Sequence, residues 1–340
     1  MRFPPWLDSI KTRVTLSMLV VFLVGLWALA LLTTRILERD ITELVTDSQT
    51  SVTVQLAAQL DRALSVRIQA LEKTAALITA EMMQDTAGLQ RFLENRVLLQ
   101  EMFNVSVLTL DADGISIADA PYNPARIGFN FRTFLDAFAK TLDQNRPFIG
   151  DPLIGRFSDE PLIPFSVPIR DQSGQVIGAL GGAINLAQPN LLEEMTRGGY
   201  GQRGYYSIVS KDSRMVVTAS VPELLMYQLP PTGVDEAIDR AMAGEEGSFR
   251  YTTVNGVDSL ATLKGLDSVN WFITTISALV AALRPVAIMK RQLLFSTLLV
   301  TMLVGLTIWW LLKSQLKPIF PPSSLLDMPQ VPMTLPRRYR

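Results

Sequence analysis

Two long apolar segments constrain the fold of this chain more than any other feature. They cover residues 14–32 and 293–312, are 19 and 20 residues long, and contain no charged side chain. Because a helix rises about 1.5 Å per residue, each segment is long enough to cross the roughly 30 Å hydrocarbon core of a bilayer. A cleaved signal peptide is the alternative for the first segment, with residues 28–30 as the cleavage site, but the apolar run continues past that site. We therefore expect two transmembrane helices.

Basic residues that flank the two segments predict their orientation. Those at the two ends of the chain are Arg2, Lys11, Arg13, Lys313, Lys317, Arg337, Arg338 and Arg340, with only Asp8 and Asp327 opposing them. Basic residues favour the cytoplasmic side of a membrane, so we expect both termini in the cytoplasm. Residues 33–292 would then lie outside the cytoplasmic membrane as one large region.

The composition excludes several classes of function. The chain has no cysteine and no histidine, so Ser-His-Asp catalysis, Cys-His catalysis and Cys/His zinc sites cannot be built. It has 31 basic and 32 acidic residues, which argues against a nucleic-acid-binding protein. No spacing of carboxylates points to an acid–base pair. We therefore expect no enzyme activity, no metal and no cofactor.

The external region begins with a helical pattern. Apolar residues recur every three or four positions between polar ones, at Leu56, Leu60, Leu64, Ile68 and Leu71. This stripe predicts a long helix over residues 36–83, continuous with the first apolar segment. A second, shorter helix is expected over residues 87–99.

The period then changes to that of strands. We expect strand–turn–strand units over 104–120, 162–186, 205–220 and 248–266, a last strand over 270–277, and helices over 132–144 and 233–244. Asn255-Gly256 is a strong hairpin signal. Gly178, Gly181 and Gly182 are expected to allow close packing within their strand. The order hairpin, helix, strands occurs twice, so the sequence predicts an α+β fold with two similar modules, each an antiparallel sheet with flanking helices.

Three stretches resemble a known sensor family. They are "ARIGFNFRTFLDAFAKT", "GDPLIGRFSDEPLIPFSVPIRDQSGQVIGALGGAINL" and "GSFRYTTVNGVDSLATLKGLDSVNWFITTIS". The region from about residue 36 to 285 resembles the double Cache domain of bacterial receptors, most of all the version fused to diguanylate cyclases of Gram-negative bacteria. The resemblance implies two tandem PAS-like modules on a stalk helix, a homodimer, and a small ligand in the membrane-distal module. It also implies a two-pass protein of the cell inner membrane, with residues 33–292 in the periplasm.

The expected organisation follows from the spans and the resemblance together. It comprises a cytoplasmic N-terminus (1–13), a transmembrane helix (14–32), a stalk helix (36–83), a membrane-distal PAS-like module (84–195), a membrane-proximal PAS-like module (196–276), a juxtamembrane helix (277–292), a second transmembrane helix (293–312) and a short proline-rich cytoplasmic tail (313–340).

The resemblance also suggests ligand-binding residues. Arg132 stands where the family often has an arginine at the start of the pocket helix, and Phe134 follows it. Ala183 stands where amino-acid-sensing members have an acidic residue for the ligand amine, which argues against an amino-acid ligand because an unpaired buried charge is costly. Arg132 with Phe134 and Phe165 would suit a carboxylate with an apolar body, although a surface salt bridge is an equal alternative for Arg132. Further candidates are Tyr122, Arg126 and Arg156.

The sequence leaves the output of such a sensor open. It contains no GG-[DE]-[DE]-F motif of a cyclase, and the tail after the second apolar segment holds six prolines. We expect the sensory part of a diguanylate cyclase-type receptor without its output domain, either as a truncated or frameshifted gene product or acting through a separate cytoplasmic protein. A chemoreceptor fragment, a sensor kinase fragment and a ligand-free dimerising membrane scaffold are alternatives. In the sensor hypothesis, ligand closure would shift the stalk and the juxtamembrane helix, with a bend at Arg284-Pro285.

Overall fold

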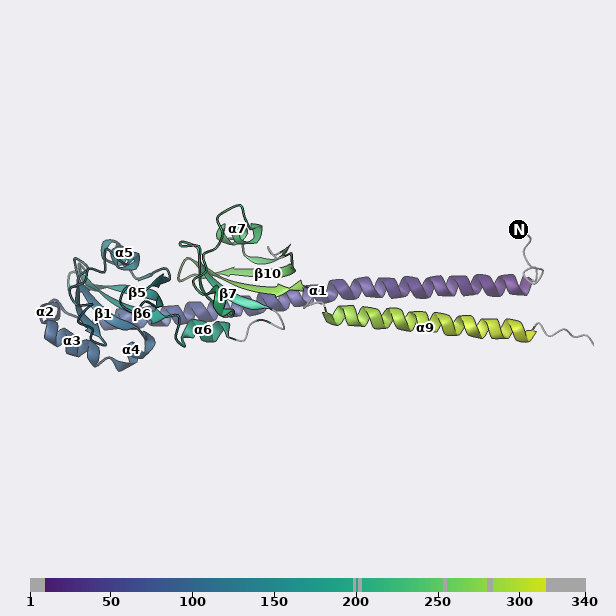
Figure 1. Ribbon diagram of the computed structural model, residues 1–340, viewed down its shortest axis with the longest axis horizontal. Helices are drawn as coiled ribbons and strands as arrows, with labels where there is room; N and C mark the ends of the chain where they lie inside the picture. The colour runs from purple at the N-terminus through teal and green to yellow at the C-terminus, as the bar shows by residue number, and fades with distance from the viewer. Residues whose placement is uncertain (1–9, 198–199, 201–203, 253–255, 280–283, 316–340) are drawn as a thin grey trace, which may run out of the picture. The chain divides into compact units, whose positions relative to one another are not determined.

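A computed structural model describes residues 10–197, 200, 204–252, 256–279 and 284–315 (Figure 1). The chain forms two compact units, one from residues 1–36 with 288–340 and the other from residues 37–287. The first unit contains the beginning of α1 (Ile10–Ala75) and most of α9 (Arg284–Gln315). Both helices are long and apolar enough to cross a membrane, over the segments expected from the sequence.

The second unit contains two antiparallel sheets of the same topology. The first has the order β2-β1-β6-β5-β3 with β4 paired to β5, and the second has the order β8-β7-β11-β10-β9. The strands of the first sheet are β1 (Ser106–Asp111), β2 (Ser116–Ala120), β3 (Phe148–Ile149), β4 (Leu153–Ile154), β5 (Pro161–Arg170) and β6 (Val176–Asn185). Those of the second are β7 (Tyr205–Ser210), β8 (Met215–Ala219), β9 (Gly247–Thr252), β10 (Asp258–Gly265) and β11 (Trp271–Ala278). The predicted α+β fold with two similar modules is therefore confirmed.

The remaining helices are short. They are α2 (Ala80–Gln84), α3 (Thr86–Glu94), α4 (Val97–Met102), α5 (Asp136–Gln144), α6 (Leu191–Thr196), the 3-10 helix η2 (Pro222–Leu224) and α7 (Glu236–Met242). Helix α5 contacts β5, β6 and β3 of the first sheet, whereas α6 contacts β7 and β8 of the second. The module boundary expected after residue 195 therefore falls inside α6, a helix that belongs to the second sheet by its contacts.

Several predicted helix bounds are wrong because capping side chains end or begin a helix where the spacing of apolar residues alone would continue it. The long helix ends at Ala75 rather than Met83, and α2 begins after Thr79, whose hydroxyl accepts the N–H of Met82 at 3.3 Å. The helix expected over 87–99 is divided into α3 and α4. The Asp85 carboxylate caps α3 by accepting the N–H of Gly88 at 2.9 Å.

Two further bounds also differ from expectation. The helix expected over 132–144 begins at Asp136, because the backbone before it forms a turn on the carbonyl of Phe131 and is extended at Leu135. The juxtamembrane helix expected over 277–292 is wrong at its start, since Ser277 and Ala278 pair with β10 as the end of β11. Residues 284–292 belong to α9, and the bend predicted at Arg284-Pro285 adjoins residues 280–283, outside the described residues.

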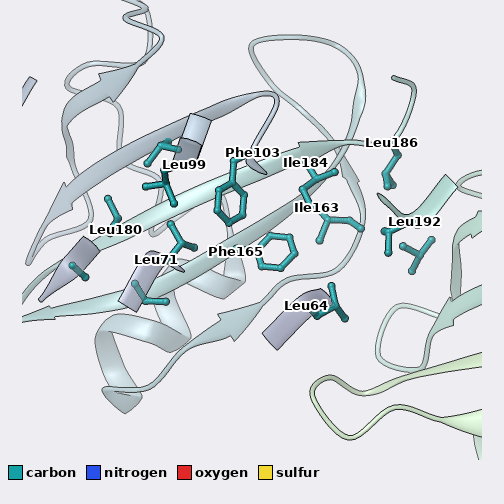
Figure 2. Packing of buried hydrophobic residues seen from close by; sticks show 14 of the residues in the cluster. Leu64, Leu71, Leu99, Phe103, Ile163, Phe165, Leu180, Ile184, Leu186 and Leu192 are labelled. Carbon is teal, nitrogen blue, oxygen red and sulfur yellow. The ribbon is translucent and has the colours of Figure 1, made fainter. Parts of the chain in front are cut away.

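The apolar stripe of α1 forms the core against both sheets. Leu60, Leu64 and Leu71 are completely buried, as the sequence period predicted, and Leu56 is buried at the edge of the same cluster. Figure 2 shows Leu64 and Leu71 beside side chains of the first sheet, among them Phe165. The cluster continues to the second sheet through Ile208, Val217, Trp271 and Ile273. One helix thus supports both modules of this unit, which follow one another along it in Figure 1.

Candidate functional site

The first module contains a cavity of about 220 Å³ beside its sheet. Strands β1, β5 and β6 form its floor, and the beginning of α5 with the loops before it and after β4 form its walls. Cross-strand pairing places Ser106, Pro164 and Ala183 side by side on this floor. The cavity therefore lies over the centre of the sheet, where residues from distant parts of the sequence meet.

Two adjacent glycines of β6 make room for aromatic rings on the two faces of the sheet, Phe138 at the cavity and Phe103 in the core. A Cβ atom at Gly181 would overlap the ring of Phe138, and one at Gly182 would lie 2.5 Å from Cγ of Phe103. Phe138 and Gly182 both line the cavity. The close approach expected from the sequence is confirmed here, because any larger side chain would displace these buried rings.

An ion pair holds one arginine at the cavity. Arg126 lies in the loop after β2, and its Nε atom is 2.9 Å from Oδ2 of Asp119, which is completely buried in β2. Burial raises the pKa of Asp119 to about 6, and the positive charge of Arg126 opposes this rise. The Arg126 side chain is only 12% exposed and Nη2 also donates to the Pro121 carbonyl at 3.4 Å. Its cationic group is therefore fixed in position at the cavity wall.

A second polar group is formed by Glu160 and Asn185. The Nδ2 atom of Asn185, at the end of β6, donates to Oε2 of Glu160, which precedes β5. Both residues line the cavity. The cavity thus has a carboxylate in addition to its guanidinium groups.

Aromatic side chains form the outer wall. Phe129 packs edge-on against Phe131, Phe134 and Phe157, with ring centroids 5.0, 6.1 and 5.1 Å apart. The guanidinium carbon of Arg156 lies 5.1 Å from the Phe129 ring centroid. All of these residues except Phe129 line the cavity. An apolar body could contact this wall while charged ends of the same molecule reach the polar groups.

Three of the six residues suggested by the sequence line the cavity, namely Arg126, Phe134 and Arg156. Arg132 instead pairs with Asp143 at 2.6 Å, with side chains 39% and 55% exposed, which is the surface salt bridge weighed as its alternative. Tyr122 is 59% exposed on the surface, and Phe165 is completely buried in the core against Phe103.

Sequence reasoning missed three polar residues of the site, Asp119, Glu160 and Asn185. One of them left a signal: an aspartate within the apolar strand pattern "SIADA" requires a cationic partner if it is buried. Ala183 lines the cavity, in keeping with the place that the resemblance gives it, but Glu160 supplies a carboxylate from another segment. Nothing in the spacing of Glu160, which lies outside a strand, indicated this.

Comparison with known proteins agrees with the fold. Residues 33–286 match the model of the Cache domain. The chain belongs to the Cache domain family. The double Cache resemblance seen in the sequence is confirmed, and the Cache region itself is a sensor domain rather than a catalytic one.

Solved structures of similar fold include ligand-binding domains of bacterial chemoreceptors. That of the Pseudomonas aeruginosa amino acid chemoreceptor PctC, in complex with GABA, is 21% identical, with a TM-score of 0.54 over 68% of this chain and 100% of the other. That of Pseudomonas fluorescens CtaA with L-isoleucine is 20% identical, with a TM-score of 0.56 over 72% and 97%. The sensory domain of Campylobacter jejuni Tlp1 is 17% identical, with a TM-score of 0.53 over 72% and 99%. No curated protein matches the sequence.

Proposed function

We propose that this protein is a membrane-anchored sensor whose first Cache module binds a small amino acid or a related zwitterion outside the cytoplasm. The observation that carries the proposal is the cavity with a fixed guanidinium, a carboxylate and an aromatic wall. The chemoreceptor domains of similar fold that are named above with GABA and L-isoleucine support this ligand class.

The carboxylate end of the ligand is assigned to Arg126. A guanidinium is always charged and presents several donors in a planar fork, which matches a carboxylate. Asp119 holds this group from behind through Nε, so no side-chain ordering is needed when the ligand binds. Arg156 lies on the same cavity and adds positive charge at its more exposed side.

The amine end is assigned to Glu160. The sequence argument against an amino acid rested on Ala183, which cannot pair with an ammonium group. Glu160 lines the same cavity and removes that objection. The phenyl rings of Phe134 and Phe157 would contact the apolar part of the ligand.

The topology expected from the sequence remains part of the proposal. Both helices that could cross a membrane place the Cache region between them, which supports a two-pass protein with residues 33–292 in the periplasm and both ends in the cytoplasm. We further propose a homodimer that passes the ligand signal through α1 and α9 to a cytoplasmic output. The resemblance to cyclase-linked domains favours a diguanylate cyclase output, and the chemoreceptor likeness favours a chemotaxis output.

Calorimetric titration of the full chain in lipid nanodiscs tests the ligand class. We expect one or more amino acids from a panel to bind, and to raise thermal stability by about 2.7 kcal/mol at 100 times the dissociation constant. Glu160→Gln should lower the affinity at least tenfold for the amino acid but not for its desamino analogue. Arg132→Gln, a surface arginine outside the cavity, is the matched control and should bind as the wild type does. If no panel member binds, or if Glu160→Gln leaves binding unchanged, the proposal is wrong, and failure of the whole panel favours the ligand-free scaffold.

A further inference from the structure

The second module contains a larger cavity, of about 500 Å³. It lies over the face of the second sheet that also contacts α7, η2 and the segment between them. Its position corresponds to that of the first cavity in the first module, because both sheets have the same strand order. It shares no residue with the first cavity.

Small side chains at the centre of the sheet create this cavity. The register pairs Ser207 of β7 with Thr274 of β11, and places Ala261 of β10 between Ile276 and Phe249. These residues point to one face because side chains alternate along a strand. Larger residues surround the small ones and form the rim, among them Tyr205, Tyr227, Phe249, Tyr251 and Phe272.

A buried hydroxyl group at the cavity has no protein partner. Thr274 is 6% exposed, and within the described part of the chain its Oγ1 atom has no hydrogen-bond partner. Buried polar atoms are nearly always hydrogen-bonded, so one left unsatisfied at a cavity wall needs an explanation. A hydrogen-bonding group on a bound molecule would provide one.

The charged side chain that lines the cavity is acidic. Asp235 is the charged residue among its lining residues, beside Tyr205 and Tyr251. Burial, and after it the charge of Asp235, raises the pKa of Tyr205, and burial chiefly raises that of Tyr251. Both phenols therefore stay neutral at physiological pH, and their rings can contact a cation. Arg240 is not among the residues that line this cavity. It lines a neighbouring cavity with Asp235, Phe249 and Tyr251, where it stacks on the Phe249 ring at 4.3 Å and pairs with Glu245 at 2.6 Å.

We propose that the second module binds a second small molecule, an organic cation with an apolar or aromatic body. The body would occupy the space over Ser207 and Ala261 and would carry a hydrogen-bonding group that reaches Oγ1 of Thr274. The ammonium group would lie between Asp235 and the tyrosine rings. Asp235 also has a structural role, since its Oδ1 atom accepts the N–H of Ile238 at 3.1 Å at the start of α7. The test must therefore remove the charge of Asp235 while keeping a side chain that caps α7.

The site is connected to α1 through the sheet. On the opposite face of β10 and β11, the buried Gln49 of α1 donates to the carbonyls of Leu260 and Thr275 at 3.1 and 2.7 Å. The strands that line the cavity on one side thus hold the stalk on the other. A molecule in this cavity would contact the same strands, so the site is placed to modulate the response to the first ligand.

Three probes of similar shape and different charge test the proposal on the full chain in nanodiscs. They are 2-phenylethylamine, 2-phenylethanol and phenylacetate, titrated by calorimetry with protein-free nanodiscs as the blank. We expect the amine to bind at least tenfold more tightly than the alcohol, and phenylacetate to bind most weakly. Equal binding of the amine and phenylacetate, or no binding of the amine, would overturn the proposal.

Three variants locate the binding. Asp235→Asn keeps a side chain that caps a helix well but removes the charge, so it should abolish the preference for the amine over the alcohol. Ser207→Leu fills the cavity and should abolish amine binding, whereas Ser106→Leu at the first cavity is the matched control and should leave it unchanged. Amine binding that persists in Asp235→Asn with its preference intact, or that Ser106→Leu abolishes, would show that the site is elsewhere. If the wild type binds the amine but no amino acid, only the proposed function of the first module is refuted.

Discussion

Substituting Arg126 by methionine should make the stability of the Cache region depend more steeply on pH. The change keeps much of the apolar side chain but removes the positive charge beside Asp119, whose carboxyl group is completely buried. Leaving a buried charge without its partner is costly, and a carboxyl group in that situation takes up a proton instead. The pKa of Asp119 should therefore rise above the value of about 6 that it has beside Arg126.

The sign and size of the effect follow from proton linkage. In the wild type the pKa of Asp119 is raised from 3.8 to about 6, so the folded chain holds a proton that the unfolded chain loses between these values. The stabilising contribution is present below pH 3.8 and is lost as pH rises to about 6, at about 1.36 kcal/mol per pH unit. In Arg126→Met this loss continues above pH 6. By pH 8 the extra loss reaches up to about 2.7 kcal/mol relative to the wild type.

Urea unfolding of the full chain in detergent micelles at pH 5 and pH 8 measures this difference. Trp271 is the only tryptophan between residues 28 and 308, so the urea-dependent change in fluorescence reports on the Cache region, over a background from the four tryptophans at 6, 27, 309 and 310. Arg126→Met should lose more stability relative to the wild type at pH 8 than at pH 5. Adding Asp119→Asn to this variant removes the titrating group and should make the loss equal at both pH values. An equal loss at both pH values in Arg126→Met alone would refute the reasoning.

Three other substitutions test the packing of α1 and of β6, each by the same unfolding assay. Gln49→Leu removes the hydrogen bonds of the buried amide to the second sheet and leaves the buried Ser277 hydroxyl without its acceptor, so it should cost about 2–4 kcal/mol, and a cost below about 1 kcal/mol would contradict this. Gly181→Ala would overlap the ring of Phe138 and should cost about 1–3 kcal/mol, whereas no change would mean that the ring moves freely. Leu64→Ala removes a completely buried side chain and should cost about 2–5 kcal/mol, while Val66→Ala, 54% exposed on the same helix, should stay within about 0.5 kcal/mol.

The fold was largely predictable because it depends on the spacing of apolar residues within single helices and strands. The stripe from Leu56 to Leu71 fixes which face of α1 is buried, and the alternation in the strand segments fixes the hairpins. The helix ends were not predictable from those periods. They depend on single side chains, Thr79 and Asp85, whose hydrogen bonds to backbone N–H groups compete with continuation of the helix.

The site was less predictable because it depends on pairing across the sequence. Arg126 and Arg132 lie in one short segment, and nothing in their spacing shows which of them reaches the cavity. The difference is that Arg126 meets the buried Asp119, whereas Arg132 meets the exposed Asp143. Glu160 reaches the cavity from a loop, where no period describes the direction of a side chain.

The contacts of α1 differ in kind between the two modules. The core between α1 and the first sheet includes the apolar Leu64 and Leu71, whose contacts tolerate small shifts of one surface over the other. The second module is joined to α1 also by directional bonds, from Gln49 and from Asp61, which accepts the N–H groups of Asp267 and Ser268 at 3.1 and 2.9 Å. Displacing α1 along the second sheet would break these bonds and leave the buried Gln49 amide and Ser277 hydroxyl unsatisfied, which costs more than repacking apolar surface. A rearrangement of the first module on ligand binding therefore meets less resistance at its own contact with α1 than at the second module, and the second sheet should move with α1.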